Sequence, residues 1–413
     1  MQPETIFTII LVIIFADYAW ERILDYLNST YWSDQLPDEL EGIYDEEKYR
    51  KSQRYEKEKQ RFSFVTDTFS FILILLMLLM GGFAFVDEIV RNITHNPVWM
   101  ALLFFGIIGL AADILFLPFS IYGTFVIEEK YGFNKTTPGT FVLDKLKGWL
   151  LGAILGGGIL ALVVWIYNAA GEWFWLIAWI ALGTFMVFMS MFYSNLIVPL
   201  FNKQTPLEEG ELRDAIESFA ARVGFKLKNI YVMDGSKRST KANAYFTGLG
   251  HKKRIVLFDT LIKKHSKEEL VSVLAHEIGH YKLKHTTLGV ALSLMQTGIM
   301  LFILSLFIGN PVLSQALGAG QGSFHMGLLA FGLLYSPLSL LLAWIMNKVS
   351  RKNEYAADRF AGKNYDPDAL ILALKKLSVD NLSNLRPHPL YVQFYYSHPP
   401  LLKRISALKD VGN

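Results

Sequence analysis

The stretch SKEELVSVLAHEIGHYKLKH, from Ser266 to His285, decides how the polar part of this chain folds. A serine followed three residues later by Glu269 is a capping box, which predicts that an α-helix begins here. His276 and His280 stand four residues apart, so they share one helix face and can bind a single Zn²⁺ ion. Glu277 is offset around the helix, where it can act as general base on a metal-bound water. The alternative is a pair of surface histidines on an amphipathic helix.

The rest of the chain has the composition of an integral membrane protein. Of its 413 residues, 52% are hydrophobic and only 19% are charged, whereas about a quarter are charged in soluble domains. These values exclude disorder and a collagen-like fibre. The absence of cysteine excludes disulfides, thiolate nucleophiles and Cys-ligated metals. The net charge of +3 is small, and we expect membrane lipids rather than nucleic acid as partners.

Seven stretches are long and apolar enough to cross a bilayer. They lie at roughly 5–23, 63–86, 98–118, 148–168, 173–201, 286–309 and 324–348. The segments 21–62, 119–147, 202–285 and the tail from Lys348 onward together hold 39 of the 40 Lys and Arg residues. The positive-inside rule therefore predicts that the N-terminus is outside and the C-terminus is cytoplasmic.

The predicted fold class is a mainly α, polytopic membrane protein with an α+β domain on its inner face. Residues 1–201 would hold the first five membrane helices and the charged inner loop 21–62, and residues 286–348 the last two. Residues 202–285 would form a zincin-like catalytic domain, and residues 349–413 its C-terminal part. Strand-like runs in the domain are Ile230–Asp234, Asn243–Leu249 and Arg254–Phe258, with a turn at Gly248–Lys253.

A third ligand for a catalytic zinc is predicted after the last membrane stretch, in the sequence Asn353-Glu-Tyr-Ala-Ala-Asp358. Two membrane stretches separate His280 from Glu354, so the chain returns to the same side of the membrane. We expect Glu354 to complete a His₂Glu site, with Asp358 one turn later orienting a ligand histidine. The alternative is an exposed helix acid paired with Arg351.

Five separate stretches of the chain carry a resemblance to one known family: Asp234–Gly248, Lys253–Leu261, the helix from Ser266, Asn353–Asp358 and Ser397–Arg404. Together they make the sequence resemble the CAAX prenyl protease 1 family of integral-membrane zinc peptidases. The resemblance implies seven membrane helices around a large water-filled chamber, closed on the inner side by the zincin-like domain. It also implies one Zn²⁺ per chain.

The family pattern assigns the ligand and base roles to the residues named above, and it adds others. Asn243 and its neighbour Ala244 would contact the substrate backbone. His398 and Arg404 would line the site, with His398 stabilising the tetrahedral oxyanion. The strand Ala242–Thr247 could hold a peptide by β-augmentation if its edge is free. The alternative is an ordinary hairpin strand.

The remaining histidines are expected to be structural. His285 lies five residues after His280, off the ligand face, and would cap a helix or mark the membrane boundary. Asp113 would face the bundle interior, either lining the chamber or bonding a neighbouring helix. His95 and His325 would lie on the outer side, and surface loops would hold His251, His265 and His388.

The expected activity is a zinc endopeptidase that cleaves near the C-terminus of prenylated (CaaX-type) or hydrophobic peptides. One alternative is a quality-control metalloprotease that degrades damaged membrane proteins, and another is a seven-helix transporter or receptor with a regulatory zinc site. The tail Lys409–Asn413 carries no evident retrieval signal, which favours a bacterial inner membrane over the endoplasmic reticulum.

Overall fold

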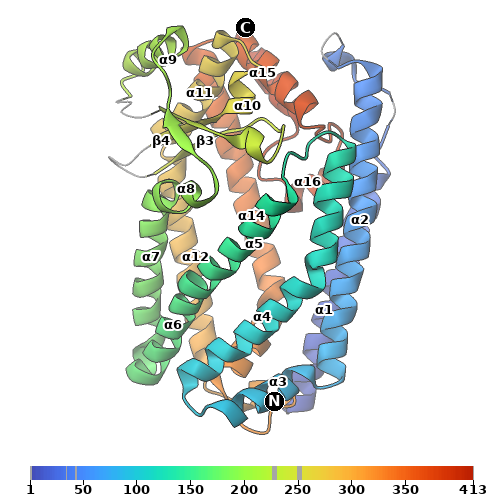
Figure 1. Cartoon of the computed structure of the whole chain (residues 1–413), viewed down its shortest axis with the longest axis vertical. Coiled ribbons are helices and arrows are strands. Elements are labelled where there is room, and N and C mark those ends of the chain that lie inside the picture. Colours follow the sequence, from blue (N-terminus) through green and yellow to red (C-terminus); the bar gives the residue numbers. More distant parts are fainter. Residues whose placement is uncertain (1, 34, 42–43, 226–229, 249–253, 413) are drawn as a thin grey trace.

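The computed structural model describes residues 2–33, 35–41, 44–225, 230–248 and 254–412 as a mainly helical molecule with one small sheet. Long helices run along the molecule, and the sheet and shorter helices gather at the end that holds the C-terminus (Figure 1). The N-terminus lies at the opposite end. The long-helix part consists of α1 (Pro3–Ser29), α2 (Glu46–Leu79), α3 (Gly82–Ile93), α4 (Pro97–Tyr122), α5 (Pro138–Leu151), α6 (Gly157–Ala170), α7 (Phe174–Leu196), α8 (Val198–Phe201), α12 (His285–Phe307), α13 (Pro311–Ala316) and α14 (Phe324–Asn364). The other helices are α9 (Glu211–Arg222), α10 (Asp259–Ile262), α11 (Lys267–Lys282), α15 (Pro367–Asp380), α16 (Pro389–Tyr395) and α17 (Leu401–Gly412).

Five helical stretches among the described residues are long and apolar enough to cross a membrane. They are Glu46–Leu79, Pro97–Glu128, Pro138–Phe201, His285–Phe307 and Phe324–Asn364. The sequence predicted seven, and the difference has two sources. Helix α1 is not among the five, and it carries charged residues in its second half. The stretch Pro138–Phe201 counts once, although it reverses direction at Gly171 between α6 and α7 (Figure 1).

The predicted span 63–86 is wrong at its C-terminal end. Helix α2 ends at Leu79, and Gly81 adopts a left-handed φ of 68°, which glycine reaches without a steric penalty. The chain therefore turns into α3, which lies across the end of the bundle (Figure 1). Phe83 and Val90 of α3 are buried there.

In the described part of the chain, four strands form one sheet in the order β1-β2-β4-β3. Strands β2 (Ile230–Met233) and β4 (Arg254–Phe258) are parallel, and β1 (Gln204–Pro206) and β3 (Ala244–Thr247) flank them antiparallel. The three predicted strands are confirmed, the first two with slightly shorter bounds and the third with the same bounds, and β1 was missed. The predicted turn falls mostly on 249–253, outside the described residues. Because β3 is at the end of the order, its far edge pairs with no other strand of the described residues, which confirms the expectation of an edge strand.

The core beside the sheet is built around α11. Nearly every residue of this helix from Glu269 to Gly279 is buried, and a helix covered on all sides lies inside its domain. The charged segment 21–62 contributes to this core, because Tyr44 and Tyr49 are buried in the same cluster. This segment is therefore partly integrated with the predicted catalytic domain.

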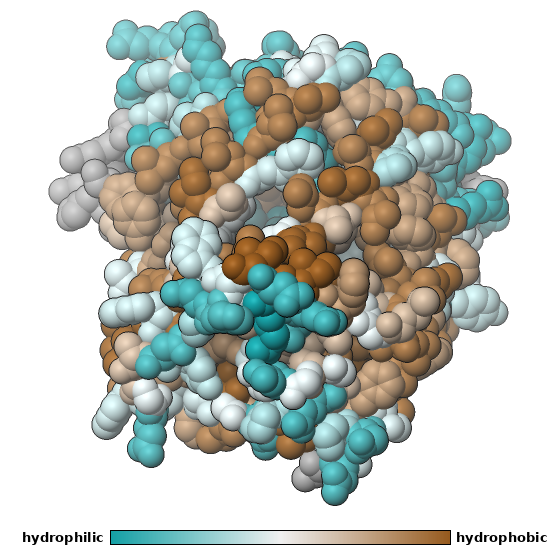
Figure 2. Space-filling model, turned by 60° about the horizontal axis from the view of Figure 1, so that its bottom comes forward, coloured by the Kyte–Doolittle hydropathy of each residue, from teal (hydrophilic) through white to brown (hydrophobic). Residues whose placement is uncertain are grey.

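Large apolar side chains are exposed along the long helices. Examples are Phe64, Leu79, Ile114, Leu150 and Phe302. Figure 2 shows apolar surface over much of the face seen there, interrupted by a hydrophilic cluster near its centre and by hydrophilic residues at its upper and lower margins. Apolar surface of this extent is typical of a protein whose helices contact lipid.

Candidate metal centre

A close approach of two helices creates the site. Helix α14 is one continuous 41-residue helix that passes from the last apolar stretch into the polar end, and α11 packs on it. At Gly279 an added Cβ would lie 3.1 Å from Cδ1 of Phe360 and 3.3 Å from Cα of Ala357. A larger residue would push the helices apart, so this glycine lets α14 reach the face of α11 that carries the two histidines.

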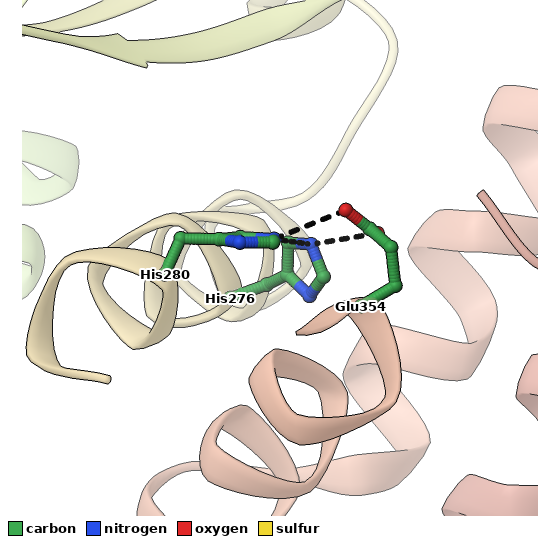
Figure 3. Close-up of side chains that lie close together, drawn as sticks. All are labelled: His276, His280 and Glu354. Carbon is green, nitrogen blue, oxygen red and sulfur yellow. Dashed lines mark hydrogen bonds and ion pairs between the residues drawn. The ribbon is translucent and has the colours of Figure 1, made fainter. Parts of the chain in front are cut away.

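The three predicted ligands meet at this crossing (Figure 3). Nε2 of His276 and Nε2 of His280 are 3.1 Å apart. The carboxylate of Glu354 completes the group, with Oε1 3.2 Å from His280 Nε2 and Oε2 3.4 Å from His276 Nε2. Tetrahedral ligands at ordinary zinc distances of about 2.0–2.1 Å lie about 3.3 Å from one another. The spacing therefore matches three ligands of one zinc ion.

The chemistry of this group also fits zinc. Two imidazoles and a carboxylate form a donor set that zinc accepts in catalytic sites. Glu354 is only 4% exposed, and its buried Oε2 has no hydrogen-bond partner among the described residues. A buried carboxylate oxygen without such a partner is costly, and a cation removes that cost. The alternative pairing with Arg351 is wrong, because that guanidinium donates to the carbonyl oxygens of Val392 and Tyr396.

A buried acid orients the first histidine. Oδ1 of Asp358 lies 2.9 Å from His276 Nδ1, which leaves Nε2 directed at the ligand group. Arg404 donates through Nε and Nη2 to the same carboxylate at 2.8 and 2.5 Å. Asp358 therefore lies where the sequence predicted it. Arg404 is 9% exposed and is held mainly by this acid, with Nη1 3.7 Å from Glu354 Oε2.

Glu277 lies beside the ligands on α11, partly exposed to a cavity. Burial raises the pKa of its carboxyl, while the neighbouring His276 and His280 and a backbone hydrogen bond with Phe246 oppose this rise. A raised pKa moves a carboxylate toward the range in which it exchanges protons near neutral pH. This is the property required of a general base.

The free edge of β3 faces the same cavity, which has a volume of about 510 Å³. Phe258 donates its N–H to the carbonyl of Asn243, so alternation along the antiparallel pair turns the backbone groups of Ala244 and Phe246 away from β4. His398 lies at this cavity as well, with its side chain 63% exposed and Nε2 3.3 Å from Glu354 Oε1.

The cavity has two contrasting surroundings. Toward the long helices its wall includes the apolar Leu288, Leu292, Met346 and Val349, with the polar Thr286, Ser350 and Asn353 beside them. A second cavity of about 720 Å³ shares Asn243 and His398 with the first. Its lining is more polar and includes Tyr55, Glu56, Lys59, Lys241, Asn381 and Arg404. The ligand group therefore lies between an apolar space beside the long helices and a polar space within the C-terminal end.

Other sequence expectations have mixed outcomes. His285 begins α12, and its Nδ1 lies 3.1 Å from His280 Nδ1, a contact that the helical periodicity did not predict. The prediction that His265 lies in a surface loop is wrong, because its side chain is buried and hydrogen-bonds to the carbonyl of Leu261. The carboxylate of Asp113 accepts hydrogen bonds from Lys145 and Trp149 on a neighbouring helix. Of its two expected roles, this is the bond to a neighbouring helix.

Two further histidines are described at the ends of helices. His325 is buried near the N-terminal end of α14 and pairs with Asp87 at 2.6 Å. His388 precedes α16, and its Nδ1 accepts the Leu390 N–H. His251 lies outside the described residues. The contacts described for His325 and His388 do not form a second cluster of histidines.

Comparison with known proteins gives a consistent result along the whole chain. Residues 26–203 match the model for the CAAX prenyl protease N-terminal region with five membrane helices, and residues 206–411 match peptidase family M48. The probable CAAX prenyl protease 1 of Schizosaccharomyces pombe is 37% identical, over 95% of this chain and 86% of that protein. The CAAX prenyl protease 1 homolog of Homo sapiens is 32% identical, over 99% and 96% of the two chains.

A solved structure agrees with these matches. The crystal structure of S. mikatae Ste24p superposes with a TM-score of 0.92 and 34% sequence identity, covering 98% of this chain and 99% of that one. The similarity extends over both the long helices and the polar end. The membrane part and the peptidase part therefore belong to the same family. The chain belongs to the membrane-embedded metallopeptidases of family M48 that carry the N-terminal helices of the CAAX prenyl proteases.

Proposed function

We propose that this protein is a membrane-embedded zinc endopeptidase that cleaves near the C-terminus of prenylated (CaaX-type) or hydrophobic peptides. The proposal rests on one observation: the His276–His280–Glu354 group, Glu277 and the edge strand β3 all line the same cavity. The relatives named CAAX prenyl protease 1 support the substrate class.

Each residue of the group has a distinct role in the proposed reaction. His276, His280 and Glu354 would hold one Zn²⁺, which when bound supplies a Lewis acid for the scissile carbonyl. Glu277 takes a proton from the attacking water and passes it to the leaving amine. His398 donates a hydrogen bond to the oxyanion of the tetrahedral intermediate.

Substrate would bind as an additional strand. The outward carbonyl groups of Ala244 and Phe246 can accept hydrogen bonds from an extended peptide, as in β-augmentation. Their N–H groups now donate to the side chains of Asn243 and Glu277, and a bound peptide would replace these two partners. Asn243 lies where the two cavities meet and would contact the peptide backbone there. Arg404 lines the second cavity and pairs with Asp358, the acid that holds His276. An apolar or lipid-modified residue fits the space beside Leu288 and Met346, and a polar chain end fits the second cavity.

Cleavage of one peptide in farnesylated and unmodified forms tests the proposal. Full-length protein in detergent should cut the farnesylated form with the higher kcat/KM, because the apolar cavity wall adds binding energy in proportion to the buried area. Equal, Glu277-dependent cutting of both forms would favour the quality-control role. If zinc-loaded protein cut neither form nor any other peptide, a transporter or receptor would replace the peptidase proposal.

The oxyanion role of His398 predicts a loss in turnover. His398→Phe removes the donor but keeps a ring of similar size, so kcat should fall by about 10²–10³-fold, as when other oxyanion donors are removed. Zinc content should stay unchanged, since His398 is not a proposed ligand. His95→Phe, at an exposed residue remote from the site, is the matched control and should behave as wild type. A higher KM with unchanged kcat would instead make His398 a binding residue.

We further propose seven membrane helices around a chamber, with the N-terminus outside. Residues 1–201 and 286–348 would form the membrane part, and 202–285 with 349–413 the catalytic domain on the cytoplasmic face. The concentration of Lys and Arg in the alternate segments supports this arrangement. A bacterial inner membrane rather than the endoplasmic reticulum remains a prediction.

The absence of cysteine makes the orientation straightforward to measure. Single exposed cysteines are introduced as Asn92→Cys at the predicted outer side and Lys267→Cys at the predicted inner side. In intact cells a membrane-impermeant maleimide should label the first variant, and the second only after permeabilisation. The reverse labelling pattern would overturn the proposed orientation, and labelling of both in intact cells would place the two sites on one side.

A further inference from the structure

The two ligand histidines use their second ring nitrogens differently. His276 Nδ1 faces the carboxylate of Asp358 at 2.9 Å. His280 Nδ1 faces another imidazole nitrogen, Nδ1 of His285, at 3.1 Å. The two rings are nearly perpendicular, with centroids 5.1 Å apart and an interplanar angle of 74°. Each ligand histidine therefore has a partner behind it, but only the first partner is an acid.

A neutral imidazole carries one ring proton, and its position determines which of the two rings donates the hydrogen bond. A metal-binding histidine presents an unprotonated nitrogen to the metal, so its one ring proton lies on the other nitrogen. With Nε2 of His280 in the ligand group, the proton is on Nδ1. That N–H needs an acceptor, and a ligand histidine is usually fixed by such an outer hydrogen bond. His285 Nδ1 can accept it when the proton of that ring is on Nε2.

We propose that His285 is a positioning residue for the metal site, which accepts the Nδ1–H of His280 and does for this ligand what Asp358 does for His276. The proposal rests on the metal site proposed above. His285 holds the ring plane and tautomer of His280 and does not itself coordinate the ion. A neutral acceptor also adds no further negative charge to a site that already contains Glu354, Asp358 and Glu277.

The backbone between the two helices makes this contact possible. In one continuous helix with 3.6 residues per turn, a residue five positions after His280 would lie about 140° away around the axis. Lys284 instead adopts a left-handed φ of 59°, which ends the first helix and starts α12 in a new direction. The first residue of α12 is His285, and its ring consequently returns to the last turn of α11.

Two substitutions at the same position separate the hydrogen bond from the shape of the side chain. His285→Phe keeps an aromatic ring against His280 but has no acceptor. His285→Asn places an amide oxygen at the same δ position as Nδ1, so it can restore the acceptor. Zinc affinity is measured on full-length protein in detergent by competition with a chelator, which reports metal binding independently of cleavage.

The Phe variant should bind zinc about 10–100-fold more weakly, which is the usual cost of losing an outer-shell partner. The Asn variant should stay close to wild type, and His285→Ala should show the same loss as Phe. The melting temperatures of the three metal-free variants should agree, because the proposed role exists only toward the metal.

Equal zinc affinity of the Phe variant and wild type would overturn the proposal. An Asn variant as weak as Phe, or a metal-free Phe or Ala variant that melts well below the Asn variant, would also overturn it in favour of a packing role. Wild-type protein that binds no zinc would contradict the metal site itself, so the two failures are distinguishable.

Discussion

The Glu277→Gln variant should lose peptide cleavage by about 10²–10⁴-fold while it keeps its zinc. The amide has the shape of the carboxylate but cannot take a proton from water. The three ligand side chains are untouched, and Glu277 is beside the group rather than part of it. Metal content and the melting temperature should therefore match those of wild type, and the loss should appear in kcat.

Single-turnover cleavage by full-length protein measures this effect, with zinc counted per chain by elemental analysis. Glu268→Gln is the matched control, because this exposed acid lies on the same helix but in its first turn. The control should cleave at the wild-type rate. Wild-type turnover in the Glu277→Gln variant would remove Glu277 from the reaction, and loss of zinc would make it part of the ligand set.

Glu354→Ala should lose both zinc and activity. Removing a residue that merely hydrogen-bonds a ligand costs about 10–100-fold in metal affinity, so deleting a ligand should cost more than about 100-fold. The substitution also leaves His276 and His280 without the carboxylate that faces both of them. At nanomolar free zinc the purified variant should consequently contain far less metal than wild type.

Chelator competition and elemental analysis follow this loss, and Lys352→Ala provides the control. Lys352 is exposed on the same helix two residues away, so its removal should change neither zinc content nor cleavage. Excess zinc should restore part of the activity of Glu354→Ala if binding is what was lost. Unchanged zinc stoichiometry in Glu354→Ala at limiting zinc would eliminate Glu354 as a ligand.

Local signals in the sequence predicted much of the site. The capping box at Ser266 is present, and the helix begins at the next residue. The four-residue spacing of His276 and His280 sufficed to place both side chains on one face, since helical periodicity is a property of neighbouring residues. The third ligand required a longer argument, from an even number of membrane crossings, and Glu354 does meet the two histidines.

Features that depend on distant segments or on a single backbone torsion were missed. The short β1 pairs with β2 across the intervening α9, and three residues carry too little pattern to predict it. The break at Gly81 and the turn at Lys284 are each set by one left-handed residue, which apolar periodicity does not register. The second of these turns brings His285 to His280.

The sequence by itself determined the apolar stretches, the helix with its paired histidines, and the acid that joins them. The apolar stretches follow from composition, the paired histidines from spacing within one helix, and the acid from the even number of membrane crossings that separates it from them. Tertiary structure alone decided how closely α11 and α14 approach at Gly279, which edge of the sheet is free, and which groups surround the ligands. These depend on packing between segments far apart in the chain, where a few tenths of an ångström decide whether three side chains can share one ion.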